Sequence, residues 1–354
     1  MPFRSGLFNM KTCTIHGPKS LEIEDRPIPR PDANELLIRL GAGGICGSDL
    51  HYYHEGGVGD FRLKKPFILG HEVAGEVVEV GSGVESLKLG QRVAVNPTRA
   101  CLRCPECLSG RSNLCRDVYF YGSAARVPHV DGGFAEYFIA TERQCMAVPE
   151  TMDFRVAACA EPLAVTGHAA FRAGSLVGKR VLITGAGPIG VLLAATCRFS
   201  GATDVVLTDL LDEPLKTAKK MGATETVNVS HVENALTKGS LKSAFDVAFE
   251  ASGSLKALES CILVTRVGGK VVQVGSLPPG SSAAPLNKIM AKEIDLLGSF
   301  RFADEYRWAV DVLSRGWIDV TPMLTRTFPL SDAVQAFELA SDRRRAMKVS
   351  LVAG

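Results

Sequence analysis

Four cysteines stand close together in the first half of the chain: Cys101, Cys104, Cys107 and Cys115, in the pattern C-x2-C-x2-C-x7-C. Two-residue spacings let successive thiolates converge on one ion, and a fourth thiolate completes a tetrahedron. Zinc held by four thiolates, each about 2.3 Å away, is a closed structural site that does no chemistry. Free thiols, disulfides and an iron–sulfur cluster are the alternatives. The spacing predicts a structural zinc lobe from about residue 97 to about residue 117.

A second set of metal-ligand residue types is dispersed along the chain. Cys46 lies in GGICGSD, His71 and Glu72 follow Gly70, and Glu161 lies in AEP. Taken singly, a cysteine or histidine is more often part of a hydrophobic core than a ligand. Flanking glycines, however, favour tight loops around Cys46 and the His71-Glu72 pair. These residues are therefore candidates for a catalytic centre.

A glycine-rich segment, GAGPIG, contains Gly185, Gly187 and Gly190, with Pro188 and Ile189 between the last two. It follows the apolar run VLIT and opens the apolar run IGVLLAAT, which is the strand–turn–helix context of a dinucleotide site. The first glycine permits the turn, the second admits a pyrophosphate, and the third allows close packing of helix and strand. The helix N-terminus then faces the phosphates with its partial positive charge.

Asp209 ends the next apolar run, DVVLT. A carboxylate at this place accepts hydrogen bonds from the adenosine ribose hydroxyls and repels a 2′-phosphate, which favours NAD over NADP. The alternative interpretation is an aspartate that only caps the following helix.

The elements that position these residues change in character along the chain. The first half is rich in glycine and proline, with short β-type runs at 35–40, 72–80 and 92–95. After about residue 160, strands and helices alternate, which predicts the α/β class with a doubly wound parallel sheet. The tail is predicted to be helical from Glu305 and to end in a strand over 348–352. The expected strands of the parallel sheet are 181–184, 204–208, 245–251, 270–275 and 294–300, with helices after the first and over 214–221.

Composition excludes several classes of protein. The chain has 354 residues, with 40 Lys and Arg against 38 Asp and Glu, a net charge of +2. This balance gives no electrostatic reason to expect nucleic acid or an anionic membrane as the main partner. The most apolar run, 181–197, contains three glycines and a proline, and it is too short for a typical spanning helix. The first ten residues lack the apolar stretch of a secretory signal. We expect a cytoplasmic protein, in which clustered cysteines are metal ligands rather than disulfides.

GHE followed by a β-type run, the four-cysteine lobe and the later GAGPIG together resemble the zinc-dependent medium-chain dehydrogenases. AEPLAV is similar to the polyol, or sorbitol, branch of that family, because the alcohol dehydrogenases have a cysteine where this chain has Glu161. The resemblance covers nearly the whole chain. It implies a GroES-like, β-rich catalytic domain formed by residues 1–160 and 300–354, and a Rossmann domain over residues 161–299.

The resemblance also implies a catalytic zinc held by Cys46, His71 and Glu161. Glu72 is then either a ligand or a neighbouring carboxylate. Three protein ligands leave one position open for water or substrate. Zinc at such a site lowers the pKa of a substrate hydroxyl, whose carbon then gives up a hydride. In the family relay, Ser48 takes the released proton and His51 passes it to solvent.

On the cofactor side, the resemblance places Val274, Ser276 and Phe300 along the nicotinamide. Relatives of the sorbitol type often carry an arginine near the ribose where this chain has Pro214. NADP therefore stays open beside the NAD that Asp209 favours. The expected cofactors are two Zn²⁺ per chain, one catalytic and one structural, and NAD.

For the substrate, the resemblance points to Tyr52, Glu161 and Arg301. Arg301 also suits a carboxylate, through a bidentate charge-assisted bond. Phe302 stands where relatives usually have a tyrosine, and the lost hydroxyl favours a sugar acid over a plain polyol. Further cationic candidates are Arg126 and His129.

We therefore expect an enzyme that oxidises a secondary hydroxyl of a sugar acid to a ketone, with a polyol as the alternative substrate. An interpretation of another class is a non-catalytic dinucleotide-binding structural protein, which would be expected to lack metal ligands or relay residues. A zinc-ribbon nucleic-acid module is disfavoured by the near-neutral charge. The resemblance implies a homotetramer, with a dimer as the alternative.

Overall fold

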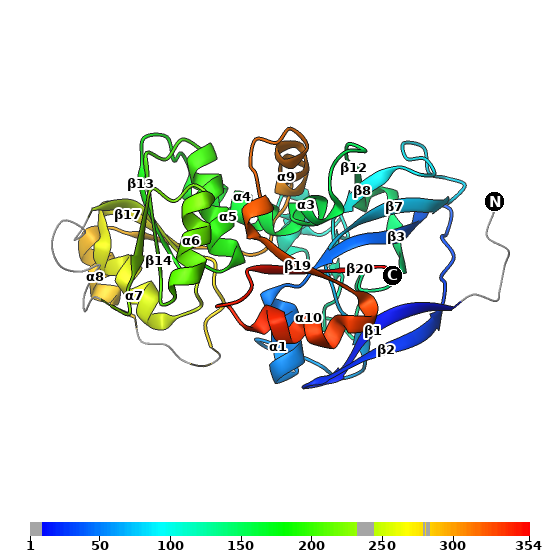
Figure 1. Cartoon of the computed structure of the whole chain (residues 1–354). Coiled ribbons are helices and arrows are strands. Elements are labelled where there is room, and N and C mark those ends of the chain that lie inside the picture. Colours follow the sequence, from blue (N-terminus) through cyan, green and yellow to red (C-terminus); the bar gives the residue numbers. More distant parts are fainter. Residues whose placement is uncertain (1–8, 232–243, 279, 281–283) are drawn as a thin grey trace.

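The computed structural model describes residues 9–231, 244–278, 280 and 284–354. In this part of the chain, two main sheets lie toward opposite ends of the molecule (Figure 1). Helices α4 (Ala160–Ala173) and α9 (Glu305–Ser314) pack on each other between the two sheets. Helix α4 also contacts a strand of each sheet, so it joins the two halves.

The sheet formed by the middle of the chain is parallel throughout. Alternate residues of its strands pack on opposite faces: Ile183 and Leu207 join a core that includes α5, whereas Leu182 and Val206 join a core that includes α7. Helices cover both faces, which explains why the strands are apolar runs rather than alternating patterns. The described strands, in spatial order, are β15 (Glu225–Asn228), β14 (Asp204–Asp209), β13 (Arg180–Thr184), β16 (Phe245–Glu250), β17 (Thr265–Gln273) and β18 (Asp295–Gly298).

Four helices accompany these strands. The element α5 follows β13 directly, and α6 follows β14, so the chain alternates strand and helix as the sequence predicts. The carboxyl ends of parallel strands meet at one edge of the sheet, where ligands bind in folds of this kind. The helices are α5 (Pro188–Phe199), α6 (Asp212–Lys220), α7 (Leu255–Val264) and α8 (Leu286–Lys292).

The other main sheet combines the first part of the chain with its C-terminal end. Strand β20 pairs with β3 through Leu351 and Gly43, so the tail completes a sheet begun about three hundred residues earlier. Apart from β19 and β20, which pair in parallel, its strands are antiparallel. The strands are β3 (Glu35–Gly44), β7 (Glu72–Val80), β8 (Arg92–Val95), β11 (Tyr137–Thr141), β12 (Cys145–Ala147), β19 (Leu324–Pro329) and β20 (Lys348–Val352).

Shorter elements surround this sheet. Strands β1, β2 and β6 form a smaller sheet, and side chains of β1 and β6 share a core with β3, β7 and α10. These elements are β1 (Asn9–Gly17), β2 (Ser20–Pro27), α1 (Gly47–Glu55), β4 (Gly57–Val58), β5 (Phe61–Arg62), β6 (Phe67–Ile68), β9 (Thr98–Arg99), α2 (Pro105–Leu108), η1 (Ser112–Leu114), β10 (Tyr119–Phe120), η2 (Glu142–Gln144), α3 (Phe154–Ala158), η4 (Thr321–Met323), η5 (Leu330–Asp332) and α10 (Ala333–Ser341).

The predicted α/β class is confirmed, and the strands expected at 72–80, 92–95 and 348–352 have those bounds. The tail differs from the prediction in one element, because β19 interrupts the expected helical region. Its sequence, LTRTFP, lies at the end of the sheet and has two exposed residues, so it lacks the apolar pattern of a buried strand. Among the described residues, no helix has the length and apolar character required to cross a membrane.

Candidate functional site

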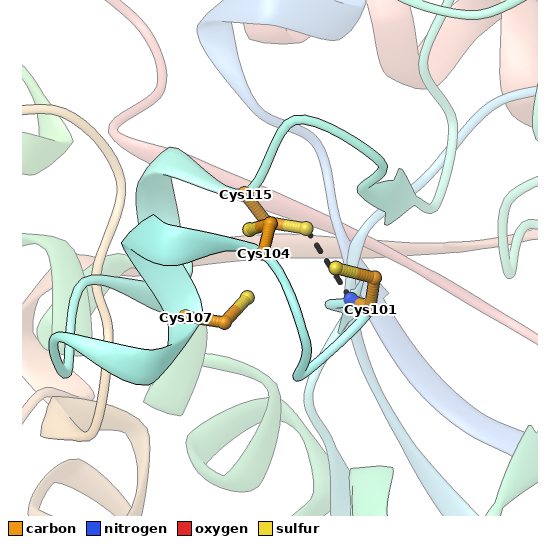
Figure 2. A group of neighbouring side chains, drawn as sticks. All are labelled: Cys101, Cys104, Cys107 and Cys115. Atoms are coloured by element: carbon orange, nitrogen blue, oxygen red, sulfur yellow. Dashed lines mark hydrogen bonds between the residues drawn. The ribbon is translucent and has the colours of Figure 1, made fainter.

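The four clustered cysteines converge. One ligand atom from each of Cys101, Cys104, Cys107 and Cys115 lies within 4.8 Å of all the others. Figure 2 shows their sulfur atoms turned toward a common centre from a loop and the short helix α2. The backbone N–H of Cys101 donates to Sγ of Cys115 at 3.2 Å, and that of Asp117 donates to the same sulfur at 3.3 Å. We call residues 101–115 the cysteine lobe.

The surroundings of the cysteine lobe suit a closed metal site. Hydrogen bonds from the backbone N–H groups of Arg103 and Cys104 lower the pKa of the Cys101 thiol to about 6, whereas burial and the neighbouring thiols raise the pKa of the Cys107 thiol to about 12, a rise that a bound cation would oppose. Leu102 and Leu108 are exposed, so the lobe buries little apolar surface of its own. Four sulfur donors without water suit zinc in a structural role. The chemistry of the donors thus fits the ion that the spacing predicts.

A second group of metal-ligand side chains comes together at the ends of β3 and β7. Gly44, the last residue of β3, pairs with Glu72, the first residue of β7. A Cβ on Gly44 would lie 2.2 Å from Oε2 of Glu72, so a larger residue here would displace the Glu72 carboxylate. The register brings ligand atoms of Cys46, His71 and Glu72 within 4.8 Å of one another. We call these three residues the buried cluster.

Electrostatics show that the buried cluster is short of positive charge. Burial, with Glu72 nearby, raises the pKa of the Cys46 thiol to about 12. Burial also raises the pKa of Glu161 to about 8, although His71 opposes the shift. The Cys46 thiol and the Glu161 carboxyl group would therefore be protonated and neutral at pH 7 unless a nearby cation stabilises their charged forms. A sulfur, a nitrogen and carboxylate oxygens around one point are also the donors of a catalytic zinc, so the residues present fit that ion.

Glu161 does not belong to the buried cluster itself. It lies in the first turn of α4 and is buried, and His71, Glu72 and Cys46 all act on its pKa electrostatically. Its carboxylate therefore faces the buried cluster from the helix that joins the two sheets. Ligand atoms of Glu72 thus lie together with those of Cys46 and His71, and Glu161 interacts with the same three residues from α4.

Two neighbours of the buried cluster had no signal in the sequence. Asp49 is fully buried; its carboxylate accepts the backbone N–H of Cys46 at 2.9 Å and lies 3.6 Å from Nδ1 of His71. That His71 nitrogen is buried and has no hydrogen-bond partner among the described residues. Asp49 thus ties the Cys46 loop to the His71 loop. A carboxylate beside a ligand histidine is a frequent orienting arrangement at zinc sites.

The second missed neighbour is Lys348, the first residue of β20. Its ammonium donates to both carboxylate oxygens of Glu72, at 2.7 and 2.8 Å, and to the carbonyl of Ile45 at 3.2 Å. Burial alone would lower the pKa of Lys348, but Glu72 and Cys46 raise it above its ordinary value, so the lysine stays charged. The C-terminal strand therefore supplies a fixed positive charge to the buried cluster.

The expected proton relay lies on α1, directly after Cys46. Ser48 is in the first turn, and its side chain hydrogen-bonds the Cys46 thiol, which opposes the rise in the pKa of Cys46. His51 is about half exposed, and its Nδ1 lies 3.2 Å from Oε1 of Glu55. Residues three apart on a helix are neighbours on its surface. Ser48, which contacts Cys46, is therefore followed on the same face of α1 by the half-exposed His51.

The glycine-rich segment forms the turn from β13 into α5. Gly185 has a φ of 93°, and a Cβ on Gly190 would lie 1.8 Å from the carbonyl oxygen of Gly185. Both positions therefore require glycine. A Cβ on Gly187 would meet nothing within 4 Å, so the N-terminus of α5, where Pro188 and Ile189 begin the helix, is open. This opening fits a pyrophosphate.

Asp209 ends β14 beside this turn. Its Oδ2 accepts the backbone N–H of Ala186 at 2.7 Å, and its Oδ1 accepts the backbone N–H groups of Leu210 and Leu211. Arg343, from the segment after α10, donates to Oδ2 at 2.6 Å. No sequence pattern predicts this pair, because the two residues are 134 positions apart. Val274 and Ser276 follow β17, and Phe300 follows β18, so all three lie at the same sheet edge as Asp209.

The substrate candidates come together near Glu161. Arg301 has a φ of 53°, and its guanidinium lies 4.1 Å from the centre of the Phe120 ring. Burial lowers the pKa of Arg301, whereas Glu161 and Tyr52 raise it, so the three side chains act on one another electrostatically. The Tyr52 hydroxyl accepts the backbone N–H of Ala124 at 2.9 Å, which leaves its proton available to a ligand.

The two further cationic candidates have partners. Arg126 forms an ion pair with Asp117 and lies 4.0 Å from the ring centre of Tyr119. His129 bonds through both ring nitrogens, to the backbone N–H of Lys64 and to the carbonyl of Arg126. Their contacts explain both residues without a ligand, which leaves Arg301 as the stronger candidate.

Comparison with known proteins gives the family. Residues 32–150 match the alcohol dehydrogenase GroES-like domain, and residues 188–315 match the zinc-binding dehydrogenase family. L-Idonate 5-dehydrogenase (NAD(P)(+)) of Escherichia coli is 42% identical over 97% of this chain and 98% of its own length. The chain belongs to the zinc-binding dehydrogenase family. It is thus a zinc-dependent NAD(P) dehydrogenase with a GroES-like part and a Rossmann-like parallel sheet.

Structures of this family support the assignment. The crystal structure of L-idonate 5-dehydrogenase from E. coli superposes with a TM-score of 0.92, 41% identity and 98% coverage of both chains. A Sinorhizobium meliloti protein crystallised with NADP bound gives a TM-score of 0.89 at 32% identity, over 98% of this chain and 99% of that one. Sorbitol dehydrogenase of Bacillus subtilis is 39% identical over 94% of each chain. The zinc-binding dehydrogenases similar to this chain thus include both sugar-acid and polyol enzymes by name.

Proposed function

We propose that this dehydrogenase reversibly oxidises a secondary hydroxyl of a sugar acid to a ketone, with L-idonate and 5-keto-D-gluconate as substrate and product. The observation that carries the proposal is Arg301. Among the described residues, no carboxylate lies within ion-pairing distance of its guanidinium, although burial makes an unpaired charge unfavourable there. A substrate carboxylate would supply that partner. The similarity to L-idonate 5-dehydrogenase supports the same substrate class.

The buried cluster supplies the reaction centre in this proposal. Cys46, His71 and Glu72 would hold the catalytic zinc, with Glu161 facing the position left for the substrate hydroxyl. When bound, zinc lowers the pKa of a hydroxyl and the dinucleotide accepts a hydride. The charge of Lys348 offsets that of Glu72, so the carboxylate remains ionised in a buried place.

The remaining residues move a proton and orient the two organic ligands. Ser48, beside the Cys46 thiol, would take the proton released from the hydroxyl, and His51 would pass it to solvent. Tyr52 and Arg301 would hold the sugar acid by hydroxyl and carboxylate. Gly187, Asp209 and the residues after β17 and β18 would hold the dinucleotide along the sheet edge. The residues proposed for the nicotinamide side are Val274, Ser276 and Phe300.

We also propose a domain division, a cellular location and an oligomeric state for this protein. We infer a catalytic domain formed by residues 1–160 and 300–354 around a Rossmann domain at 161–299, which the return of β20 to β3 supports. A cytoplasmic location is supported by clustered thiols, which need a reducing compartment to serve as metal ligands. A homotetramer, with a dimer as the alternative, rests on the resemblance to the polyol branch.

The experiment that tests the proposed function is a substrate panel. L-Idonate, 5-ketogluconate, sorbitol, xylitol and D-gluconate are assayed with NAD and with NADP, on the wild type and on Arg301→Met. We expect the highest kcat/KM for L-idonate, and a loss of roughly tenfold or more in Arg301→Met, because a charged hydrogen bond is removed. Sorbitol should lose less, since it has no carboxylate. A preference for sorbitol or xylitol would identify a polyol dehydrogenase, and no turnover of L-idonate or 5-ketogluconate would overturn the proposed substrate.

A further inference from the structure

Arg343 makes a contact between the two halves of the molecule that the reaction itself does not require. It follows α10, in the part of the chain that completes the antiparallel sheet, whereas Asp209 ends β14 in the parallel sheet. Its guanidinium donates to Oδ2 of Asp209 at 2.6 Å. Asp209 is nearly fully buried, and the Arg343 side chain is about half exposed. The arginine thus covers the outer side of the carboxylate that the family uses for the adenosine ribose.

A dinucleotide that binds at this edge approaches a carboxylate, Asp209, that already accepts several hydrogen bonds. Oδ1 accepts from the backbone of Leu210 and Leu211, and Oδ2 accepts from the backbone of Ala186 and from Arg343. Among the described residues, Arg343 is the side chain that donates to Asp209, and the other donors are backbone N–H groups. Ribose hydroxyls must therefore compete with Arg343 for the carboxylate oxygens. A 2′-phosphate, by contrast, brings an anion to a place where a guanidinium already stands, and arginine binds phosphate through a bidentate fork.

We propose that Arg343 is a cofactor-specificity residue that lets this dehydrogenase accept NADP beside NAD. Asp209 alone would repel a 2′-phosphate, and its charge is offset by Arg343. Position 214 is a proline and offers no cation, so among these residues it is Arg343 that brings a positive charge to Asp209. The inference rests on the proposed function only in that the dinucleotide binds at the edge occupied by Asp209.

The test is dinucleotide binding without substrate, measured by calorimetry on the zinc-loaded, full-length protein. In Arg343→Gln, we expect the Kd for NADP to rise by about tenfold to a hundredfold, because a charged bond to phosphate is lost. The Kd for NAD should stay within about threefold or fall, since the competitor for Asp209 has gone. Arg343→Lys, which keeps the charge, should restore part of the NADP affinity.

Arg344→Gln is the matched control. It removes the same charge one residue later, from an exposed side chain that is not among the partners of Asp209. It should leave the ratio of the two Kd values unchanged. An equal loss for both cofactors in Arg343→Gln, no change in either, or a wild type that does not bind NADP would each overturn the proposal. Because no substrate is present, these results are independent of whether the sugar-acid activity is found.

Discussion

The cysteine lobe and the buried cluster are both metal-ligand sets, but the chain builds them in opposite ways. The lobe takes four identical donors from residues 101–115, on a loop with exposed leucines. The buried cluster takes a sulfur, a nitrogen and a carboxylate from the ends of two strands, and a third strand adds the charge of Lys348. The lobe is therefore specified locally, whereas the buried cluster exists only once β3, β7 and β20 have paired.

The difference in construction matches a difference in what each site can do. Four thiolates close the coordination of zinc, so the cysteine lobe can hold the fold but cannot admit a substrate. In the proposed function, the three mixed donors of the buried cluster would leave a position open for substrate; Ser48 and Glu161 act on the buried cluster, and Arg301 acts on Glu161. The site built from neighbouring residues is thus the one proposed for the structural role, and the site built from distant segments is the one proposed for catalysis.

The largest expected effect is on turnover, in Cys46→Ser. Loss of this ligand should lower kcat by roughly a thousandfold or more, because a Lewis-acid metal contributes several kcal/mol to the barrier. NAD binding should be largely retained, since the dinucleotide site lies on the parallel sheet. Cys145→Ser, the same change at a buried thiol of β12, is the control and should keep its activity. Normal turnover in Cys46→Ser would refute the catalytic assignment.

The next effect is on stability, in Lys348→Met. The substitution leaves the buried carboxylate of Glu72 without its ion-pair partner, which should lower the free energy of unfolding by about 3–5 kcal/mol. Urea unfolding of the zinc-free protein measures it, because a zinc ion bound by Glu72 would itself pair with that carboxylate. Arg315→Met breaks an exposed pair with Asp311 at the C-terminal end of α9 and should cost less than about 1 kcal/mol. Equal losses in the two variants would show that Lys348 does not stabilise the buried cluster.

A local effect is expected in the cysteine lobe, for Cys107→Ser. The lobe should lose its zinc and become sensitive to limited proteolysis between residues 97 and 117, because little apolar burial holds it. Turnover of the protein that remains folded should stay within about a factor of a few of the wild type, since a closed site does no chemistry. A loss of turnover as large as that of Cys46→Ser would contradict the division of roles.

The smallest effect concerns the connection between the lobe and the substrate side. The Asn113 amide, in η1 of the lobe, donates to the carbonyl of Phe300 at 2.9 Å, directly before Arg301. Asn113→Ala removes that bond, and a neutral hydrogen bond contributes about 0.5–1.5 kcal/mol. We therefore expect KM for the sugar acid to rise by about twofold to tenfold, with kcat little changed. Ser112→Ala is the control, and an unchanged KM in Asn113→Ala would show that the lobe does not position Arg301.

The sequence predicts the features that depend on nearby residues. The spacing of Cys101, Cys104, Cys107 and Cys115 predicts their convergence, and GAGPIG between two apolar runs predicts the turn from β13 into α5. The alternation of strands and helices predicts the parallel sheet, because buried apolar runs and glycine turns are both local signals.

Long-range pairing accounts for what the sequence does not predict. Lys348 and Glu72 are 276 residues apart, and Arg343 and Asp209 are 134 residues apart. Each pair depends on which strands become neighbours, and no spacing rule gives that. Asp49 escapes prediction for a different reason: it lies three residues from Cys46, but its contact with His71 forms only once the His71 loop packs against it. Strand β19 was missed because its exposed side chains lack an apolar pattern.

Metal analysis of the wild type beside Cys46→Ser and Cys107→Ser tests the central claim, that one chain holds two zinc ions in sites of different construction. We predict about two zinc ions per chain in the wild type and about one in each variant. Only the zinc lost in Cys46→Ser should be required for turnover. One zinc or none in the purified wild type would contradict the account.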